Sequence, residues 1–328
     1  MALEPLISVI NLKKYFPVYA GLISKLTGYV KAVDGVSFSI LPGEIFGLVG
    51  ESGCGKSTTG KTVLKLLNPT EGKVYFRGRD VFAMNKNELC SLRTEMQIIY
   101  QDPFSSLDPR MMIGEAVGEA LEEHGIARGR AKKERVEYML EVCGLDPHHF
   151  YRYPHEFSAG QRQKVCIARA LALNPRFIAA DEPISFLDVS IQAQLINLLK
   201  KIQEEFGLTF LFISHDLRVV QHLSDKVAVM YLGKIVETGS SSIIYRDPLH
   251  PYTRALLSAV PAADPTLKKK ERIILKGDVP SPVDPPRGCR FHTRCQYSQD
   301  ICKEEIPVLK KTAEGHFTAC HLIKSGAK

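Results

Sequence analysis

Residues 50 to 58 constrain the fold more than any other segment of this 328-residue chain. They read Gly-Glu-Ser-Gly-Cys-Gly-Lys-Ser-Thr, follow the apolar run Ile45–Val49 and precede a helical pattern that continues to Leu67. A phosphate-binding P-loop needs this order of strand, loop and helix, because glycines let successive backbone N–H groups point at phosphate oxygens beside a helix N-terminus. The segment therefore predicts a nucleotide-binding α/β fold.

Each position of this loop has an expected role in binding a nucleotide. Lys56 is expected to reach the β- and γ-phosphates, and Ser57 to hold Mg²⁺ through its hydroxyl. The other expected contacts come from Gly50, Glu51, Ser52, Gly53, Cys54, Gly55 and Thr58. Cys54 is expected to fill its loop position without doing chemistry. The alternative, a glycine-rich turn without a ligand, is disfavoured by the complete GxxxxGKS pattern.

Two acidic residues follow a second apolar strand. Asp181 and Glu182 come directly after Phe177–Ala180. Asp181 is expected to orient Mg²⁺, whereas Glu182 faces another direction and is expected to act as general base on the attacking water. Paired acids at a strand end can also be a simple helix cap. The presence of Lys56 in the same chain favours a nucleotide hydrolase.

His215 follows the apolar strand Leu211–Ser214. Ligands of parallel α/β sheets bind at the carboxyl ends of strands, so this histidine is placed to sense a γ-phosphate. A surface histidine without such a role is the alternative.

Strand patterns alternate with helical patterns, which indicates an α/β layer fold with a mainly parallel sheet. The expected strands are Ile7–Asn11, Ser37–Ile40, Ile45–Val49, Val74–Phe76, Gln97–Tyr100, Phe177–Ala180, Phe210–Ser214 and Val227–Tyr231. Between them, segments such as Gly114–His124 and Lys132–Val142 show helical spacing. A helical subdomain at about 102–168 is therefore expected inside the α/β core.

The composition changes after about Tyr245, where prolines such as Pro248, Pro251 and Pro280 exclude long helices and central strands. We expect a domain covering 1–245 and a smaller C-terminal extension covering 246–328. Four of the eight cysteines, Cys289, Cys295, Cys302 and Cys320, lie in this extension.

The overall composition is that of an ordinary globular protein, with 45% hydrophobic and 24% charged residues. No stretch approaches the roughly 18 consecutive apolar residues that cross a bilayer, and the N-terminus shows no secretory pattern, so a cytoplasmic location is expected. The net charge of +7 comes from Lys and Arg scattered along the chain. Such scattering does not favour nucleic-acid binding.

With these residues identified, the chain resembles the ATP-binding subunits of ABC transporters from about residue 5 to 321, in particular those of oligopeptide and dipeptide importers. Phe157-Ser158-Ala159-Gly160-Gln161 resembles the ABC signature, before a helix expected to begin near Arg162. The resemblance implies that these residues contact the γ-phosphate of ATP held by a partner subunit, because a helix N-terminus attracts phosphate. The family usually has Leu at 157 and Gly at 159, so Ala159 places a methyl group near the nucleotide.

Further motifs support the resemblance. Gln101 is placed like the Q-loop glutamine, which implies contact with Mg²⁺ or water and movement with the helical subdomain. Ser185-Phe186-Leu187-Asp188 resembles the D-loop, with Phe186 where the family usually has Ala. The fold implied is an ABC cassette: a P-loop NTPase with a RecA-like core, a β-rich N-terminal part and an inserted helical subdomain.

The resemblance also assigns the two remaining nucleotide contacts. His215 takes the position of the switch histidine. Phe16, or its neighbour Tyr15, is placed like the aromatic residue that stacks on adenine. A core aromatic side chain is the alternative for these two residues.

The terminal cysteines are separated by gaps of five, six and seventeen residues. Paired zinc ligands prefer gaps of two to four, so this spacing fits zinc poorly, whereas four thiolates can bind an iron–sulfur cube. The resemblance implies a [4Fe–4S] cluster on Cys289, Cys295, Cys302 and Cys320. The alternatives are zinc assisted by His292, His316 or His321, and free thiols or a disulfide.

The resemblance implies an ATPase that energises import of dipeptides or oligopeptides from the cytoplasmic face of the membrane. The stretches Asp102–Arg110 and His250–Leu256 resemble those of the peptide-importer subgroup. The implied partners are two membrane-spanning permease subunits, a second ATPase subunit that is a homologue or a copy, and an extracytoplasmic solute-binding protein. No nucleic-acid partner is expected. The alternatives are transport of nickel or oligosaccharide, a nontransport ABC ATPase acting on nucleic acid, and a redox-sensing regulator.

Overall fold

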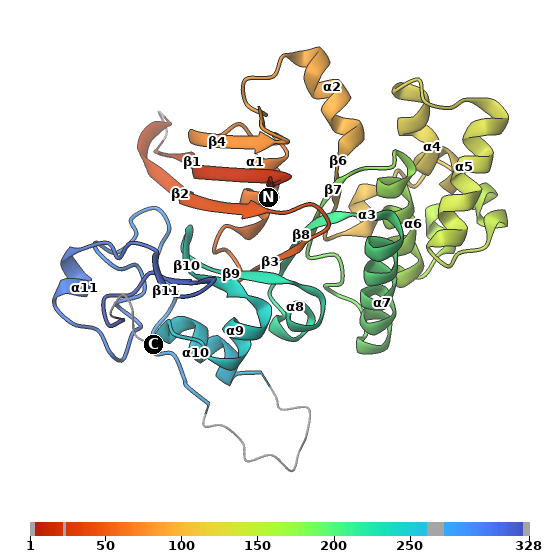
Figure 1. The fold of residues 1–328 in the computed structure, drawn as a ribbon. Coiled ribbons are helices and arrows are strands. Elements are labelled where there is room, and N and C mark those ends of the chain that lie inside the picture. Colours follow the sequence, from red (N-terminus) through yellow and green to blue (C-terminus); the bar gives the residue numbers. More distant parts are fainter. Residues whose placement is uncertain (1–3, 22–23, 261–271, 324–328) are drawn as a thin grey trace, which may run out of the picture. The chain divides into compact units, whose positions relative to one another are not determined.

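The computed structural model describes residues 4–21, 24–260 and 272–323 (Figure 1). The chain divides into two compact units. Unit 1 comprises residues 1–6, 40–44 and 83–213, and unit 2 comprises residues 7–39, 45–82 and 214–328. Parts of the predicted extension, 261–271 and 324–328, lie outside the described residues, as do residues 1–3 at the N-terminus.

Three parallel strands form the sheet of unit 1. They are β6 (Met96–Ile99), β7 (Phe177–Asp181) and β8 (Thr209–Ser214), with β7 in the middle. Every residue of β7 and β8 is buried, which explains why both read as unbroken apolar runs in the sequence. Because the strands are parallel, the carboxyl ends of β7 and β8 lie at the same edge of the sheet.

Helices make up the rest of unit 1, and α4, α5 and α6 pack against one another (Figure 1, yellow to green). The helices are α2 (Lys86–Glu95), α3 (Pro103–Ser106), α4 (Ile113–Glu123), α5 (Gly129–Val142), α6 (Ala159–Ala172) and α7 (Val189–Phe206), with 3₁₀ turns at Pro147–Tyr151 and Pro154–Glu156. The two helical patterns noted in the sequence correspond to α4 and α5.

The packing of α4 follows from its sequence. Its buried apolar side chains recur at helical spacing, on Ile113, Ala116, Val117 and Leu121. Gly118 allows close contact with α5, since a Cβ there would lie 2.8 Å from the side chain of Lys132. The Lys132 ammonium, although nearly buried, pairs with Glu115 at 2.7 Å and Glu122 at 2.9 Å. These ion pairs compensate the desolvation of the lysine.

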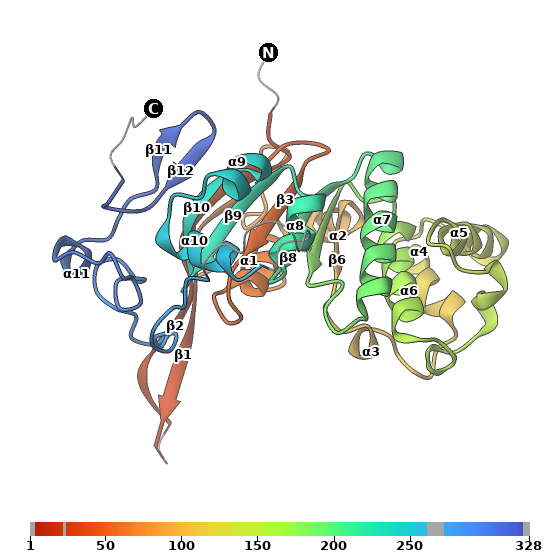
Figure 2. The same ribbon diagram turned by 90° about the horizontal axis from the view of Figure 1, so that it is seen from below.

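An antiparallel sheet opens unit 2, in the order β2-β1-β4-β5. Its strands are β1 (Ile7–Ala20), β2 (Lys25–Ile40), β4 (Glu71–Phe76) and β5 (Arg79–Asp80). β1 and β2 run side by side as a long pair of strands (Figure 2), and β1 pairs with β4 over Ile7–Lys13. The sequence predicted only the inner ends of these two strands, because the outer part of β2 is largely exposed and lacks apolar alternation.

A second group of strands in unit 2 leads to the P-loop. β3 (Ile45–Val49) pairs in parallel with β9 (Lys226–Tyr231), and β9 pairs with β10 (Lys234–Ser240) in the antiparallel direction. The C-terminal hairpin of β11 (Lys310–Ala313) and β12 (His316–Thr318) is added to β10 through β12. The prediction of a mainly parallel sheet therefore holds for β3 and β6–β9, whereas β10–β12 add antiparallel pairs that the sequence did not indicate.

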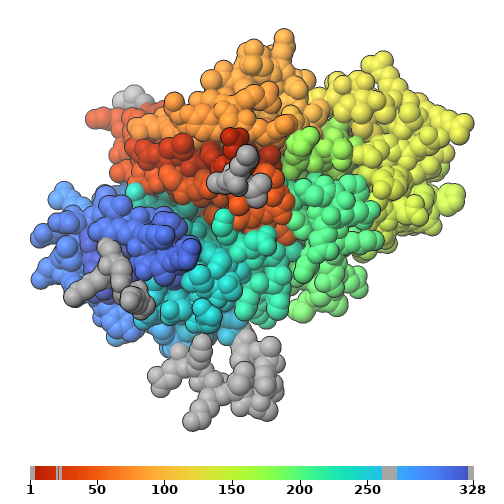
Figure 3. Space-filling view, in the orientation of Figure 1, coloured from red at the N-terminus to blue at the C-terminus, as the bar shows by residue number. Residues whose placement is uncertain are grey.

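The helices of unit 2 are short: α1 (Lys56–Val63), α8 (Leu217–Leu223), α9 (Ser241–Arg246), α10 (Pro251–Ser258) and α11 (Ile301–Glu304). Pro251 stands at the first position of α10, where its missing N–H costs no helical hydrogen bond. The C-terminal residues (blue) form one surface with the region of α9 and α10 (cyan) in Figure 3. Within the described part of the chain, no helix has the length and apolar character needed to span a bilayer.

The core of the helical subdomain can be tested at Leu121. Leu121→Ala removes a fully buried side chain and should lower the free energy of unfolding by about 2–4 kcal/mol, because a cavity remains. Ile126→Ala, at an exposed apolar side chain of the same unit, is the matched control and should change it by less than about 0.5 kcal/mol. Urea denaturation measures both. Equal losses for the two variants would contradict the packing of α4.

Candidate functional site

The P-loop connects β3 to α1, and its glycines are required by its backbone geometry. Gly53 and Gly55 have φ angles of 79° and 108°, which side-chain-bearing residues rarely adopt. A Cβ on Gly55 would lie 2.0 Å from the carbonyl oxygen of Ala32, and one on Gly50 would lie 2.2 Å from that of Met230. The glycine pattern recognised in the sequence therefore has two physical causes, positive φ and close approach of neighbouring backbone.

Lys56, the first residue of α1, is folded back over the loop. Its side chain is buried, and Nζ donates to the carbonyl oxygens of Gly50 at 2.8 Å and Glu51 at 3.1 Å. The residue before the helix is Gly55, which has no side chain that could cap the helix. The positive end of the helix and the lysine ammonium thus belong to one short segment, as anion binding requires.

The thiol of Cys54 is also buried in this loop. Burial raises the pKa of Cys54, while the neighbouring Lys56 acts in the opposite direction. A thiol that keeps its proton is a poor nucleophile, so the structure supports a packing role for Cys54.

In unit 1, the acidic pair lies at the carboxyl end of β7. Asp181 is the last residue of the strand and is buried. Glu182 has a φ of 48°, an unusual value for a long side chain, and its N–H donates to Ile213 of β8 at 3.0 Å. The two carboxylates therefore leave the strand end from different backbone conformations.

Two side chains orient the carboxylate of Glu182. Gln101 Nε2 donates to Glu182 Oε2 at 3.1 Å, and Ser185 Oγ donates to the same oxygen at 2.9 Å. The structure thus brings the Q-loop candidate Gln101 to the base candidate Glu182 and the first D-loop residue Ser185, which lie about 80 residues further along the chain. A carboxylate held in one orientation is suited to accept a proton from a positioned water.

His215 lies in the loop between β8 and α8 and is exposed. The residues on either side fix this loop, because the N–H of Asp216 donates to Ser214 Oγ at 3.0 Å and the Asp216 carboxylate accepts the N–H of Arg218 at 2.9 Å. The capped start of α8 therefore holds His215 at the carboxyl end of β8, which is the position expected of a γ-phosphate sensor.

The signature segment begins α6, and here one expectation was wrong. The helix begins at Ala159 rather than near Arg162, because Ser158 and Gln161 form a capping box: Ser158 Oγ accepts the N–H of Gln161 at 3.3 Å, and Gln161 Oε1 accepts the N–H of Ser158 at 3.0 Å. A capping box starts the helix immediately after its first member. Ser158 is exposed at this helix N-terminus.

The two departures from the usual signature are explained locally. Phe157 is buried against the ring of His149, with centroids 5.0 Å apart, so it is a core residue. Ala159 is the first helical residue and is not among those with positive φ, so its backbone does not require glycine. Gly160 does need to be small, because a Cβ there would lie 2.6 Å from Ile191 of α7.

The D-loop candidate exposes apolar surface. Phe186 is 87% exposed with a φ of 65°, and Val189, at the start of α7, is 79% exposed. Asp188 precedes α7 and its carbonyl accepts the N–H of Gln192 at 2.9 Å, but its side chain caps no N–H group. Large exposed apolar side chains this close together are typical of an interaction surface.

The two aromatic candidates for adenine stacking lie on β1 and differ in their contacts. The hydroxyl of Tyr15 donates to Asp34, and burial together with this bond raises the pKa of Tyr15. The ring of Phe16 has the ammonium of Lys14 at 4.8 Å from its centroid. Because the polar end of Tyr15 is engaged in unit 2, the contacts favour Phe16 as the stacking residue.

The four terminal cysteines converge from separate segments of unit 2. Each thiol lies close enough to the other three for electrostatic coupling, and the N–H of Cys289 donates to the carbonyl of Cys302 at 2.8 Å. Burial raises the pKa of Cys289 to about 11. The cysteines of the described chain form no disulfide, and no three His, Cys, Asp or Glu side chains within residues 4–21, 24–260 and 272–323 are arranged around a single metal ion. The structure therefore gives no direct support to the predicted metal site.

The three histidines named as possible zinc ligands each use one ring nitrogen in a contact within the protein. His292 Nδ1 contacts the carbonyl of Cys289 at 2.8 Å, and His321 Nε2 contacts that of Glu305 at 2.9 Å. His316 Nε2 donates to the buried carboxylate of Glu237 at 2.7 Å.

Sequence reasoning missed a buried polar network around Glu237 of β10. Its Oε1 accepts the N–H of Leu249 at 2.7 Å, and its Oε2 accepts the N–H of His250 at 3.0 Å. His250 is also buried, and its Nδ1 accepts the N–H of Tyr252 as the N-cap of α10. The stretch His250–Leu256 resembles those of the peptide-importer subgroup, but its sequence does not indicate that Glu237 and His250 are buried together.

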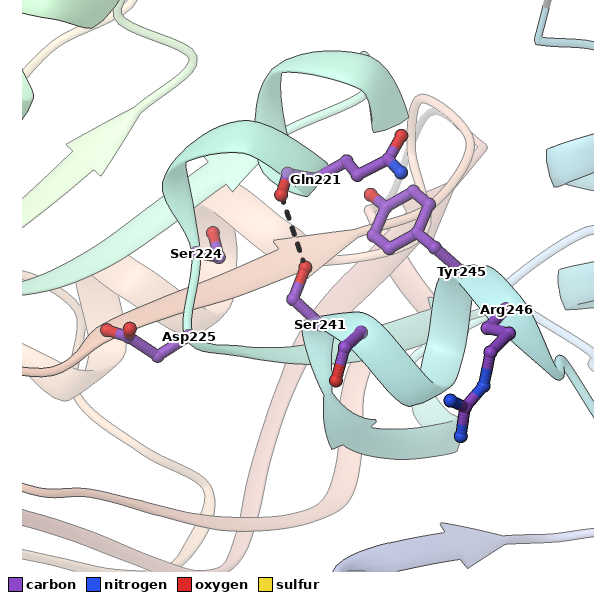
Figure 4. A pocket seen from close by; sticks show the side chains of 7 residues that line it. Gln221, Ser224, Asp225, Ser241, Tyr245 and Arg246 are labelled. Atoms are coloured by element: carbon purple, nitrogen blue, oxygen red, sulfur yellow. Dashed lines mark hydrogen bonds between the residues drawn. The ribbon is translucent and has the colours of Figure 1, made fainter.

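A cavity of about 510 Å³ opens between α8 and α9 in unit 2 (Figure 4). Its lining is polar, and Ser241 Oγ donates across it to the carbonyl of Gln221 at 3.4 Å. The Asp225 carboxylate at its edge is engaged with the N–H of Ile45. None of its lining residues belongs to the P-loop, so it is not the nucleotide site.

These features define a P-loop nucleotide-binding protein with an acidic strand end and an inserted helical subdomain. Residues 33–185 match the ABC transporter family, and residues 236–302 match the oligopeptide/dipeptide transporter C-terminal region. The chain belongs to the ATP-binding proteins of ABC transporters, in the group of oligopeptide and dipeptide transport proteins.

Individual relatives agree with this assignment. The chain is 54% identical to the oligopeptide transport ATP-binding protein AppF of Bacillus subtilis, covering 97% of this chain and 98% of AppF. It is 53% identical to the putative oligopeptide transport ATP-binding protein YkfD of the same organism, covering 98% and 96%. Among solved structures, the dimeric post-hydrolysis state of the ATP-binding cassette MJ0796 with ADP and Pi is 28% identical, with a TM-score of 0.63, covering 72% of this chain and 98% of that chain. The predicted ABC cassette fold is confirmed.

The buried imidazole of His250 should make stability depend on pH. Burial lowers the pKa of His250 to about 4, so the folded protein keeps the ring neutral while the unfolded chain protonates it near pH 6.5. Stability is therefore lost as the pH falls from about 6.5 to about 4. In urea denaturation at pH 7 and pH 5, the wild type should lose about 2 kcal/mol more than His250→Asn, which keeps an N-cap but does not titrate. Equal losses would contradict this assignment.

Proposed function

We propose that this chain is the ATP-hydrolysing subunit that energises import of dipeptides or oligopeptides through an ABC transporter. The observation that carries the proposal is the oriented carboxylate of Glu182, held by Gln101 and Ser185, in a chain that also has a complete P-loop. The substrate class rests on the relatives named for oligopeptide transport and on the match of residues 236–302 to the oligopeptide/dipeptide region. These names favour peptides over nickel or oligosaccharides.

The binding chemistry follows from the P-loop. The backbone N–H groups of residues 50–58 hold the phosphates, and Lys56 adds a positive charge that moves from loop carbonyls to phosphate oxygens. Ser57, Gln101 and Asp181 supply the oxygen ligands that Mg²⁺ prefers. Mg²⁺, when bound, neutralises charge on the β- and γ-phosphates. Phe16 stacks on the adenine ring.

Hydrolysis is an in-line attack of water on the γ-phosphorus. The water oxygen bonds to phosphorus, the bond to the β,γ-bridging oxygen breaks, and the water proton passes to the Glu182 carboxylate. Gln101 and Ser185 keep that carboxylate in place, and His215 donates a hydrogen bond to the γ-phosphate. The products are ADP and phosphate.

Each site needs a second ATPase subunit. Ser158, Ala159, Gly160 and Gln161 at the start of α6 contribute to the γ-phosphate bound by the partner, and the exposed Ser158 supports this role. The exposed side chains of Phe186 and Val189, together with Asp188, support a subunit interface at the start of α7, which packs against α6. The related cassette MJ0796 is dimeric. The second subunit is a homologue or a copy of this chain.

Two permease subunits form the membrane path, and this chain acts as a peripheral subunit on the cytoplasmic face. Four large apolar side chains of the helical subdomain are exposed, which supports a protein partner there: Phe104, Ile126, Tyr138 and Tyr151. The ring of Phe104 is held under the guanidinium of Arg162, 3.9 Å from its centroid. A solute-binding protein outside the membrane delivers the peptide to the permease.

In the C-terminal extension, Cys289, Cys295, Cys302 and Cys320 hold a [4Fe–4S] cluster. This proposal rests on the resemblance of the extension to the terminal region of peptide-importer ATPases and on the four thiols lying near one another in unit 2. Four cysteine thiolates are the ligand set that a [4Fe–4S] cluster takes. When bound, the cluster would cross-link three segments of a region with little apolar core.

Glu182→Gln tests the transport ATPase. Because the amide cannot accept the proton, ATP hydrolysis by the assembled transporter should fall by roughly 10²- to 10⁴-fold while ATP still binds. Peptide uptake into cells should be lost with it. Glu205→Gln, at an exposed glutamate of α7, is the matched control and should keep both activities. Normal uptake with Glu182→Gln would remove the proposal.

The cluster has its own test, the iron, sulfide and zinc content of protein purified without oxygen. Single serine variants at Cys289, Cys295, Cys302 and Cys320 should each lose iron, acid-labile sulfide and the visible iron–sulfur absorption. Cys90→Ser, at an exposed cysteine outside the group, should keep them. Stoichiometric zinc, or no metal at all in the wild type, would reject the cluster.

A further inference from the structure

The P-loop is held from outside by the C-terminal extension. Arg294 binds the carboxylate of Glu51, the second residue of the loop, with Nη1 2.8 Å from Oε2 and Nη2 3.3 Å from Oε1. The Arg294 side chain is only 9% exposed, so this paired geometry is largely shielded from water. Bidentate arginine–carboxylate pairs are strong and fix orientation as well as distance.

The backbone of Glu51 is held as well. Its N–H donates to the hydroxyl of Tyr252 in α10 at 2.9 Å. Tyr252 is fully buried and packs against Tyr231 and Phe291, with ring centroids 4.7 Å and 5.4 Å away. Glu51 is therefore held by hydrogen bonds at both its side chain and its backbone. Its carbonyl in turn accepts Lys56 Nζ, so the position of Glu51 affects the lysine that binds phosphate.

A second arginine of the same segment reaches the strands of the N-terminal sheet. Arg290 donates to Asp34 of β2 and to the carbonyl of Leu232. The same Asp34 carboxylate accepts the hydroxyl of Tyr15 on β1 and lies 3.3 Å from the ammonium of Lys234. Through Asp34 and Tyr15, Arg290 thus supports β1, the strand that also carries Phe16, the favoured candidate for adenine stacking.

The two arginines stand four residues apart and are separated by a buried anchor. Phe291 packs edge-on against Tyr231, with centroids 5.3 Å apart, and next to His250 at 5.7 Å. This anchoring lets Arg290 and Arg294 point to two different parts of unit 2, the N-terminal sheet and the P-loop. Cys289 and Cys295 flank the arginines directly in sequence.

We propose that Arg290, Arg294 and Tyr252 are positioning residues for ATP, so that ATP affinity depends on the C-terminal extension. Arg294 and Tyr252 position the phosphate-binding loop, and Arg290 positions the adenine-binding strand. The physical reason is preorganisation: a glycine-rich loop loses conformational freedom on binding, and a loop already held in place loses less. This inference rests on the proposed ATP-binding function.

Isothermal titration of the purified chain with ATP and with inorganic triphosphate tests the inference. Arg294→Gln should raise the Kd for both ligands roughly fivefold, within the range measured for coupled neighbouring residues. Arg290→Gln should raise the Kd for ATP and leave that for triphosphate unchanged, because triphosphate has no base. Arg287→Gln removes an exposed arginine of the same segment and should change neither Kd.

A double-mutant cycle separates positioning from general damage. Arg294→Gln combined with Glu51→Gln should bind ATP no more weakly than Arg294→Gln alone, since both changes break the same pair. Arg294→Lys, which keeps the charge but loses the fork, should lie between wild type and Arg294→Gln. If Arg294→Gln does not fold, Tyr252→Phe decides, because it removes only the acceptor of the Glu51 N–H and should also raise both Kd values.

The possible outcomes separate the proposed ATP-binding function from the proposed positioning roles. A wild-type chain that binds neither ligand would reject the proposed function itself. A wild type that binds ATP, with Arg294→Gln and Tyr252→Phe binding equally well, would overturn the positioning role alone. Equal weakening of both ligands by Arg290→Gln would overturn the division between phosphate and adenine sides.

Discussion

The close contact between the P-loop and the backbone around it is the constraint on which the rest of unit 2 depends. Carbonyl oxygens of Ala32 and Met230 occupy the space where side chains at 55 and 50 would project. Positions 50 and 55 must therefore be glycine for the loop to pass between β2 and β9. Because the loop is held by its surroundings, its N–H groups are arranged before any ligand arrives, which is what phosphate binding needs.

In unit 1, the structure fixes the orientation of one carboxylate, that of Glu182. Burial of all of β7 places Asp181 and Glu182 at the sheet edge, and the positive φ of Glu182 turns its side chain away from the strand direction. Gln101 and Ser185 then hold one oxygen of that side chain. A residue with an unfavourable backbone conformation, stabilised by its neighbours, is common where chemistry requires a particular orientation.

The C-terminal residues are structurally part of the unit that contains the P-loop. β12 pairs with β10, and the buried carboxylate of Glu237 on β10 ties together His316 of the hairpin and the start of α10. The same α10 supplies Tyr252 to Glu51, and the cysteine segment supplies Arg294. A region that looks like an appendage in composition thus contacts the nucleotide-binding loop through polar groups shielded from water.

The sequence alone determined the elements whose signals are local. The P-loop, the strands Ile45–Val49 and Phe177–Ala180, and helices α4 and α5 could be predicted because glycine spacing, apolar runs and helical periodicity depend only on neighbouring residues. The tertiary structure decided what joins distant segments: the orientation of Glu182 by Gln101, the pairing of β10 with β12, and the grip of Arg294 on Glu51. An arginine 243 positions away leaves no periodic trace in a sequence, because its partner is chosen by packing and not by spacing.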